Sequence, residues 1–425
     1  MNSSHRLSGE CPAVNQIPIR APSPGAYLAG WLAAFMITGL APGRDALAAD
    51  DPATTISATD AAHATAAVDA AEAIESPSTA APPPYTLSLG IQANAFRCDS
   101  RCIYSQRIAG SPSGDISGAA LNNVTLSGTA RVTPQLKVTL AAHYTGMGQK
   151  KGSDQVDLLM GVVRLELSDK MNFWAGRFFT PSDRVNLDGP YLTNDLTPFV
   201  DQVADSYPGV HSGAANGVTY WGDFGRWKVN LGMFHGPSLD SAVRDKGTPL
   251  AAARVMYDFW DKEEGYLLRS STYGTQNVLA LALAGQSQDG RSAWNVDGLL
   301  DRKLHTGGVL TVEFEYQKDN GLTSRVRSDG AFLMASYLLA PRIGKGQLQP
   351  LLKYSVKRFD AEAPAPAYRL RTLEANLNYV MNGESALVGV YYLKQRDFQV
   401  PAPLTSEGVR YLSPQELGLK VQFRL

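Results

Sequence analysis

Residues 85–95 read YTLSLGIQANA, and this stretch decides the fold class. Its larger apolar side chains occupy every second position, and Thr, Ser, Gly, Gln and Asn fill the positions between them. Because successive side chains of a β-strand point to opposite faces, the pattern predicts a strand with one apolar and one polar face. The same alternation returns in residues 123–132, 136–144, 227–233, 310–316, 373–379 and 417–425. The chain is therefore predicted to be all-β from residue 85 onward.

The connections between these strands are mostly short and long in alternation. Residues 133–135 form a short connection, whereas residues 180–215 form a long and polar one. Short turns at one rim and long loops at the other are typical of bacterial outer-membrane barrels, so we expect an antiparallel, up-and-down transmembrane β-barrel of about sixteen strands. Three stretches fit poorly: 260–276 is too long for the short rim, 286–293 is short for the long rim, and strand 171–179 alternates imperfectly.

Three features favour this barrel over a secreted β-sandwich or propeller, which is the alternative. The alternating stretches are longer than the about five or six residues usual in soluble strands. Tyr or Trp often stands at the end of an apolar face, as the aromatic girdle of a membrane barrel requires. Charged side chains such as Arg164, Glu313 and Lys353 stand in the middle of polar faces, where a wet lumen hydrates them and a dry core would not.

The chain before the barrel falls into two segments. Residues 1–48 are predicted to be a cleavable export signal, because basic residues precede the apolar run 26–41 and the small-x-small pattern Ala46-Leu47-Ala48 follows it. An uncleaved membrane anchor is the alternative. Residues 49–84 are rich in Ala, Thr and Pro, and are predicted to be a disordered periplasmic linker. With the barrel at residues 85–425, the expected location is the bacterial outer membrane.

The composition of the chain restricts the classes of partner that it is expected to bind. The net charge of −1 leaves no basic surplus for nucleic acid, so the expected partners are outer-membrane lipid and small hydrophilic solutes or ions. No cofactor is expected, because the sequence shows neither a metal-ligand cluster nor a haem-attachment motif. Cys98 and Cys102 are expected to form a disulfide in the first long loop, since the compartment is oxidising. A redox or metal role of this pair is the alternative.

Two groups of residues are candidates for shaping a pore. The connection 180–215 is long enough to be a functional loop. Folded into the lumen, its carboxylates would face basic wall residues and set a transverse field; a surface loop at a subunit contact is the alternative. Its charged candidates are Asp183, Arg184, Asp188, Asp195, Asp201 and Asp205. The predicted pore-lining basic residues on the strands are Arg131, Lys137, Arg164, Lys228, Arg254 and Lys353.

Several motifs resemble the phosphate-selective porin O and P family: WAGRF at 174–178, PSDR at 181–184, NLDGP at 186–190 and YDFWD at 257–261. The resemblance implies a sixteen-stranded porin, usually trimeric, with the third long loop folded into the pore. Two departures matter. Family members usually end in Phe, whereas this chain ends Phe423-Arg424-Leu425. The family's lumen carries a basic ladder, whereas the expected lumen here also carries Asp157, Glu166, Asp258, Glu313, Glu315 and Glu374, so phosphate specificity is not expected.

These features predict a porin: a water-filled channel for passive diffusion, with no enzymatic activity. The alternative is a structural role, in which the barrel sheathes a partner such as an electron-carrying cytochrome. An outer-membrane hydrolase that uses His143 is a third hypothesis, but the chain has no Gly-x-Ser-x-Gly nucleophile elbow to support it.

Overall fold

The computed structural model describes residues 84–99, 116–145, 155–188, 213–235, 248–322, 327–360, 367–396, 398–400, 410–412 and 415–425. The predicted export signal and all but the last residue of the predicted linker lie outside these residues. Within them, the fold is a closed antiparallel barrel of 16 strands, as the sequence predicts. The described residues contain no helix that is long and apolar enough to cross a membrane.

The barrel strands are β1 (Tyr85–Cys98), β2 (Ile116–Arg131), β3 (Leu136–Thr145), β4 (Gln155–Ser168), β5 (Met171–Phe179), β6 (Ala214–Phe224), β7 (Trp227–His235), β8 (Leu250–Asp258), β9 (Val278–Gln288), β10 (Arg291–Lys303), β11 (Val309–Asn320), β12 (Arg327–Leu338), β14 (Gly346–Phe359), β15 (Tyr368–Asn382), β16 (Ala386–Arg396) and β19 (Gln415–Arg424). Three further strands are short: β13 (Arg342–Ile343) pairs only with β14, and β17 (Phe398–Val400) pairs with β18 (Arg410–Leu412). Helix α2 (Arg184–Asp188) follows β5.

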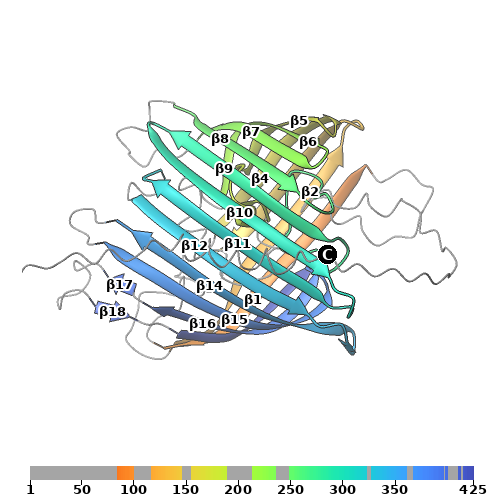
Figure 1. Cartoon of the computed structure of the whole chain (residues 1–425). Helices are drawn as coiled ribbons and strands as arrows, with labels where there is room; N and C mark the ends of the chain where they lie inside the picture. The colour runs from red at the N-terminus through yellow and green to blue at the C-terminus, as the bar shows by residue number, and fades with distance from the viewer. Residues whose placement is uncertain are drawn as a thin grey trace, which may run out of the picture. The chain divides into compact units, whose positions relative to one another are not determined.

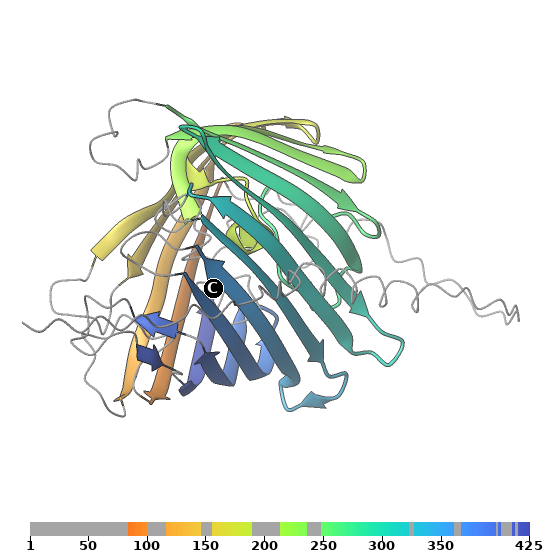
Figure 2. The same cartoon turned by 60° about the vertical axis from the view of Figure 1, so that its left-hand side comes forward.

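The strands follow one another around the wall in sequence order, and β19 pairs with β1 to close it. The closing register runs from Gly90 opposite Arg424 to Cys98 opposite Glu416. Figures 1 and 2 show the tilted strands of this wall from two directions. We call the rim with the connections β2–β3, β4–β5 and β6–β7 the short rim, and the opposite rim the long rim.

The two faces of the wall differ as the alternation predicts. On β11, the lumen face buries polar and acidic side chains, and the outer face carries Leu310, Val312, Phe314 and Tyr316. Trp227, Tyr257 and Phe259 pack edge to face on the outer face near the short rim, with ring centroids 4.7 and 4.8 Å apart. Their position fits the aromatic girdle of a transmembrane barrel.

The structure explains two of the stretches that fit the pattern poorly. The β9–β10 connection is a tight hairpin, because Asp289 and Gly290 both adopt positive φ angles, 52° and 74°, as two-residue hairpin turns favour. In β5, Gly176 has a φ of 132° and lies so close to β4 that a Cβ atom would come within 2.1 Å of the Gly161 carbonyl oxygen. Beyond this glycine, Phe178 and Phe179 are both buried, which interrupts the alternation.

Candidate functional site in the barrel lumen

Two segments leave the wall and enter the lumen. The first, residues 180–188, follows β5 and contains α2; we call it the helical segment. Its helix is the short yellow-green helix inside the barrel in Figure 2. The second, residues 259–277, connects β8 and β9 at the short rim; we call it the inner segment. The sequence predicts that the first folds inward, whereas it gives only an anomalous length for the second.

Local hydrogen bonds shape the helical segment. The Asp183 Oδ1 atom accepts a hydrogen bond from the backbone N–H of Asn186 at 2.6 Å, which is the N-cap arrangement for α2. The Asn186 side chain donates to the Thr180 carbonyl at 3.1 Å and to the Ser182 hydroxyl at 2.8 Å. The Thr180 N–H donates to the Gly213 carbonyl at 3.2 Å. This last bond joins the start of the connection to its end, next to β6.

Burial changes the acidity of Asp183, which lies outside the spanning strands. Removal from water and, to a smaller extent, the nearby Asp297 carboxylate raise the pKa of its carboxyl group to about 7. The Asn186 N–H and the Arg254 guanidinium act in the opposite direction. Asp183 therefore changes charge within the physiological pH range.

A buried ion pair joins the two segments. Arg184 donates to both carboxylate oxygens of Glu263, at 2.9 and 2.5 Å, and to the Arg269 carbonyl at 3.0 Å. The backbone adds a bond from the Leu268 N–H to the Leu187 carbonyl at 3.2 Å. Although burial alone would lower the pKa of Arg184, the Glu263 carboxylate raises it well above its ordinary value. Arg184 is therefore a permanent cation that links α2 to the inner segment.

A second bidentate pair fixes the helical segment to the wall. Arg254 of β8 donates to both carboxylate oxygens of Asp297 on β10, at 2.5 and 2.7 Å, and to the Ser182 carbonyl at 2.7 Å. Arg254 and Asp297 are 2% and 1% exposed, so water screens this pair little. On its other side, α2 contacts β12 and β14, where Val185 packs against Phe332, Met334 and Leu351.

Aromatic side chains anchor the first half of the inner segment. The Tyr266 ring lies 4.6 Å from Trp174, 5.9 Å from Phe178 and 6.3 Å from Trp221, measured between centroids. Its hydroxyl donates to the Phe179 carbonyl at 2.7 Å, and burial raises the pKa of that hydroxyl well above its ordinary value. The inner segment is thus packed against β5 and β6 as well as tethered at its two ends.

Polar contacts anchor its second half farther around the barrel. The Ser270 hydroxyl donates to Glu313 on β11 at 2.5 Å, and the Thr272 hydroxyl donates to Asp301 on β10 at 2.8 Å. Arg269 lies 3.3 Å from Glu384, in the connection between β15 and β16. The inner segment therefore reaches from the β8–β9 wall across the short-rim end of the lumen.

All six predicted pore-lining basic residues stand on the lumen face, but contacts within the barrel hold several of them. Arg164 and Lys137 both pair with Glu166, at 2.8 and 3.1 Å. The Arg164 guanidinium also lies 4.7 Å from the centre of the Trp174 ring. Arg131 is half-buried near the short rim.

The other basic residues are held in the same way. Lys228 donates to the Gly265 carbonyl of the inner segment and lies 3.4 Å from Asp223. The Lys353 ammonium lies 4.2 Å from the centre of the Phe332 ring. Like Arg254, Lys228 and Lys353 stand on the lumen face and also stabilise the structure of the lumen through these contacts.

The structure describes some predicted site residues and leaves others out. Asp183, Arg184 and Asp188 are buried in the lumen, whereas Asp195, Asp201 and Asp205 lie outside the described residues. Cys98 is fully buried and disulfide-bonded. Its expected partner Cys102 also lies outside the described residues, so that pairing stays a prediction, as does any lumen role of Asp157, whose side chain is not described.

An acidic wall on β10 and β11 is the feature that sequence reasoning recognised only in part. From Ala293 to Asp301 and from Thr311 to Asp319, every charged residue on the lumen face is a carboxylate. These residues are Asp297, Asp301, Glu313, Glu315 and Asp319, and each is at most 2% exposed. Their spacing of two or four residues is present in the sequence, but alternation alone leads us to predict only Glu313 and Glu315 as lumen residues. Within the described residues, no group of His, Cys, Asp and Glu is arranged to hold a metal ion.

Comparison with known proteins identifies the fold. No protein-family model matches the chain, and no curated protein matches it. Among solved structures, Pseudomonas putida OprB superposes with a TM-score of 0.55 at 10% identity, covering 80% of this chain and 94% of that chain. The outer membrane channel DcaP of Acinetobacter baumannii superposes with a TM-score of 0.51 at 14% identity, covering 80% and 97%. An anion-selective porin from Comamonas acidovorans gives 0.48 at 12% identity, covering 80% and 99%.

The first two likenesses show that the chain has a porin-like barrel fold. At these identities they carry no information about the solute, and they do not single out the phosphate-selective family that the sequence motifs resemble. The function of this chain therefore depends on the residues of its own lumen.

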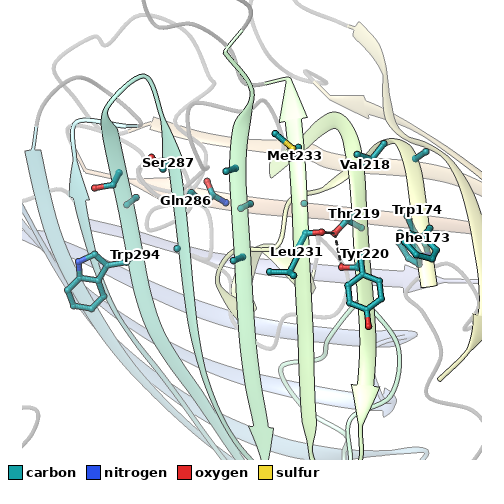
Figure 3. A pocket seen from close by; sticks show the side chains of 18 residues that line it. Phe173, Trp174, Val218, Thr219, Tyr220, Leu231, Met233, Gln286, Ser287 and Trp294 are labelled. Atoms are coloured by element: carbon teal, nitrogen blue, oxygen red, sulfur yellow. Dashed lines mark hydrogen bonds between the residues drawn. The ribbon is translucent and has the colours of Figure 1, made fainter. Parts of the chain in front are cut away.

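An apolar hollow on the outer face is distinct from the lumen. It has a volume of about 920 Å³, and it lies over β5–β10. Figure 3 shows its rim of large side chains, among them Tyr220, Leu231 and Trp294. Small residues, Ala251, Ala253 and Gly285, lie between them. Because its lining is almost wholly apolar, this hollow belongs to the lipid-facing surface and suits no hydrophilic solute.

Proposed function

We propose that this protein is a porin of the bacterial outer membrane, a channel through which small hydrophilic solutes or ions diffuse passively. The observation that carries the proposal is the closed barrel of 16 strands with a polar, charged lumen and an apolar outer face. Barrels of this strand number leave an aqueous channel, whereas about eight strands leave an interior that side chains fill. Diffusion through such a channel needs neither a catalytic group nor a cofactor.

The lumen charges support a preference for cations. The acidic wall of β10 and β11 presents five carboxylates, and Arg254 is bound to one of them. Fixed charges of one sign between low-dielectric walls concentrate counter-ions and repel ions of the same sign. The helical segment adds Asp183 and Asp188, with Arg184 already paired to Glu263.

The proposed constriction lies where the helical segment meets the inner segment. Both segments project from the wall and are bound to each other there. Asp195, Asp201 and Asp205 follow in the same connection, and we include them in the proposed constriction because their charge would act in the same direction. We also propose, on the motif resemblance, that the barrels assemble as a homotrimer surrounded by outer-membrane lipid.

The sheath hypothesis is less well supported. A barrel that encloses a partner protein needs a lumen clear of its own chain. Here the helical and inner segments occupy part of that space and are fixed by buried ion pairs and an aromatic cluster. A folded domain inside the barrel would have to displace these segments.

Reconstitution in planar bilayers tests the proposal. The purified barrel should give stepwise ohmic conductance, and a salt gradient should give a reversal potential of the cation-preferring sign. Glu315→Gln with Asp319→Asn removes two lumen charges at nearly constant size and should shift the reversal potential toward anions. The shift should shrink at 1 M salt, where the screening length is about 3 Å.

Asp329→Asn is the matched control, because Asp329 stands on the outer face of β12 and its loss should leave selectivity unchanged. A parent protein without conductance would refute the channel. Equal selectivity of the parent and the lumen variant at low salt would refute the cation preference alone.

A further inference from the structure

Three amide side chains stand together on the lumen face of neighbouring strands. They are Gln286 on β9, Asn295 on β10 and Gln317 on β11, and each is at most 4% exposed. We call them the amide triad. Figure 1 shows the three strands side by side in the wall. Asn295 stands directly opposite Gln317, and Gln286 stands opposite Ala293, so that it is a diagonal neighbour of Asn295. Side chains in these positions are within reach of one another across a sheet.

Each amide of the triad has an oxygen atom that lacks a hydrogen-bond donor. Among the residues that the structure describes, no donor reaches Gln286 Oε1, Asn295 Oδ1 or Gln317 Oε1. The orientation of the Asn295 amide is fixed, because its nitrogen donates to Asp297 Oδ2 at 3.1 Å and its oxygen points away from that carboxylate. A buried acceptor without a donor destabilises the fold, so a group of them favours a ligand that supplies donors.

Carboxylates stand on both sides of the amide triad, and the helical segment lies against it. On the wall, Asp297 and Glu315 are on its short-rim side and Asp319 is on its long-rim side. The amide nitrogen of Gln286 donates to the hydroxyl of the first residue of the helical segment at 3.5 Å. Asp183 of that segment is close enough to Asp297 for the two carboxylates to interact. The site therefore combines hydrogen-bond acceptors with negative charge.

This combination favours an ammonium group over other ligands. A primary ammonium group has one N–H donor for each oxygen of the triad, and it has no acceptor. Metal ions such as calcium take about six to eight oxygen ligands, and within the described part of the chain no acidic side chains are grouped to hold one. An anion or a zwitterion would bring a further negative charge next to Asp183, Asp297 and Glu315.

We propose that the amide triad binds the primary ammonium group of a small organic cation that passes through the lumen. The inference rests on the proposed channel function and names a solute class within it, small amines that are protonated at neutral pH. The triad would accept the hydrogen bonds of the ammonium group, and the surrounding carboxylates would stabilise its charge. Hydrogen bonds to a charged group are stronger than those to a neutral one, so a neutral solute would bind less tightly.

Binding of methylammonium to the purified full-length barrel in detergent tests the proposal. Saturation-transfer NMR measures the dissociation constants of small, weakly bound ligands. Dimethyl-, trimethyl- and tetramethylammonium lose one N–H donor with each added methyl group while their charge stays the same, so affinity should fall along this series. The test variant combines Asn295→Leu with Gln317→Met. Each hydrogen bond to a charged group contributes about tenfold to affinity, so this variant should bind methylammonium about a hundredfold more weakly.

Asn376→Leu with Gln395→Met is the matched control, because it makes the same two exchanges on the lumen face of β15 and β16. Asn376 also donates to a neighbouring carboxylate, that of Glu374. There, however, the register places Lys353 of β14 opposite Glu374, so a cation of the chain already stands beside that carboxylate. The control should bind methylammonium like the parent.

Two outcomes would overturn the proposal. Equal affinity of the parent and the test variant for methylammonium would show that the triad is not the site. Equal affinity of the parent for the whole methylated series would show that charge alone attracts these cations. If the double variant does not refold, Gln317→Met alone keeps the bond between Asn295 and Asp297 and should bind methylammonium about tenfold more weakly than the parent.

Bilayer recordings in sodium chloride separate this proposal from the proposed function. The test variant changes no charge, so it should conduct sodium ions with the cation preference of the parent while it loses methylammonium binding. A barrel that binds the methylated series in the order of donor number without conducting would contradict only the channel. A conducting barrel that binds the whole series equally would contradict only the ammonium site.

Discussion

Arg184 shows how a single side chain can connect two elements inside this lumen. Its guanidinium is 1% exposed, and Glu263 accepts from it in bidentate fashion. Two charges removed from water in this way add little net stability relative to an apolar pair, but loss of one partner leaves the other buried and unpaired. The pair therefore specifies where the inner segment docks more than it raises the stability of the barrel.

A double-mutant cycle tests this role of Arg184. Arg184→Met should cost about 3–5 kcal/mol of unfolding free energy, because the Glu263 carboxylate stays buried without its partner. Arg184→Met with Glu263→Gln should cost less than the sum of the two single changes. Urea unfolding of the refolded barrel, followed by Trp fluorescence, measures all four proteins. Additive effects would show that the two side chains act independently.

The titration of Asp183 makes both the stability of the barrel and the charge of its lumen depend on pH. Its pKa of about 7 in the folded barrel lies above the ordinary value of 3.8, so between these values the folded state holds a proton that the unfolded state has lost. This contribution to stability is complete below pH 4 and declines as the pH rises to 7. Above pH 7 the ionised carboxylate adds negative charge to the lumen.

The reversal potential of the parent should therefore move toward cations between pH 6 and pH 8. Asp183→Asn should show a smaller movement, and its amide oxygen can still cap α2. Refolded fractions of the two proteins across the same range give an independent readout. An identical pH response of the two proteins would mean that another group is responsible.

At the level of secondary-structure elements, the sequence predicts the features that the alternation of apolar and polar residues specifies. It does not predict the features that depend on tertiary contacts. The strands, the short turns and the inward fold of residues 180–188 follow from periodicity, loop length and motif resemblance. The inner segment does not, because its course depends on Tyr266 reaching an aromatic cluster from β5 to β7 and on Arg269 reaching the β15–β16 connection. Neither partner is near it in sequence, so no local pattern signals the contact.

Replacing the inner segment tests whether it narrows the pore. The β8–β9 ladder continues to a bond from the Asp261 N–H to the Asn277 carbonyl at 3.0 Å, so a two-residue Asn-Gly turn can replace residues 262–276 without opening the wall. Single-channel conductance should rise, because the lumen loses the segment that crosses it. Stability should fall, because the aromatic cluster loses Tyr266.

A variant with Arg269→Gln is the control for that replacement. It removes only the 3.3 Å contact to Glu384, which is partly exposed and contributes about 1 kcal/mol or less. Its conductance should stay close to that of the parent. If the turn replacement leaves conductance unchanged as well, the inner segment lies outside the conducting path.

For the whole molecule, the asymmetry of the two rims sets the orientation of the barrel. Long connections at one rim and short ones at the other predict that the long rim faces the cell exterior. Asn320 is exposed next to the long rim, and Lys345 is exposed in the β12–β14 connection at the short rim. With Asn320→Cys, a membrane-impermeant maleimide should label intact cells, and with Lys345→Cys it should label only after lysis. The parent is the control, since the disulfide-bonded Cys98 should not react. The opposite labelling pattern would invert the orientation of the barrel, with the long rim facing the periplasm.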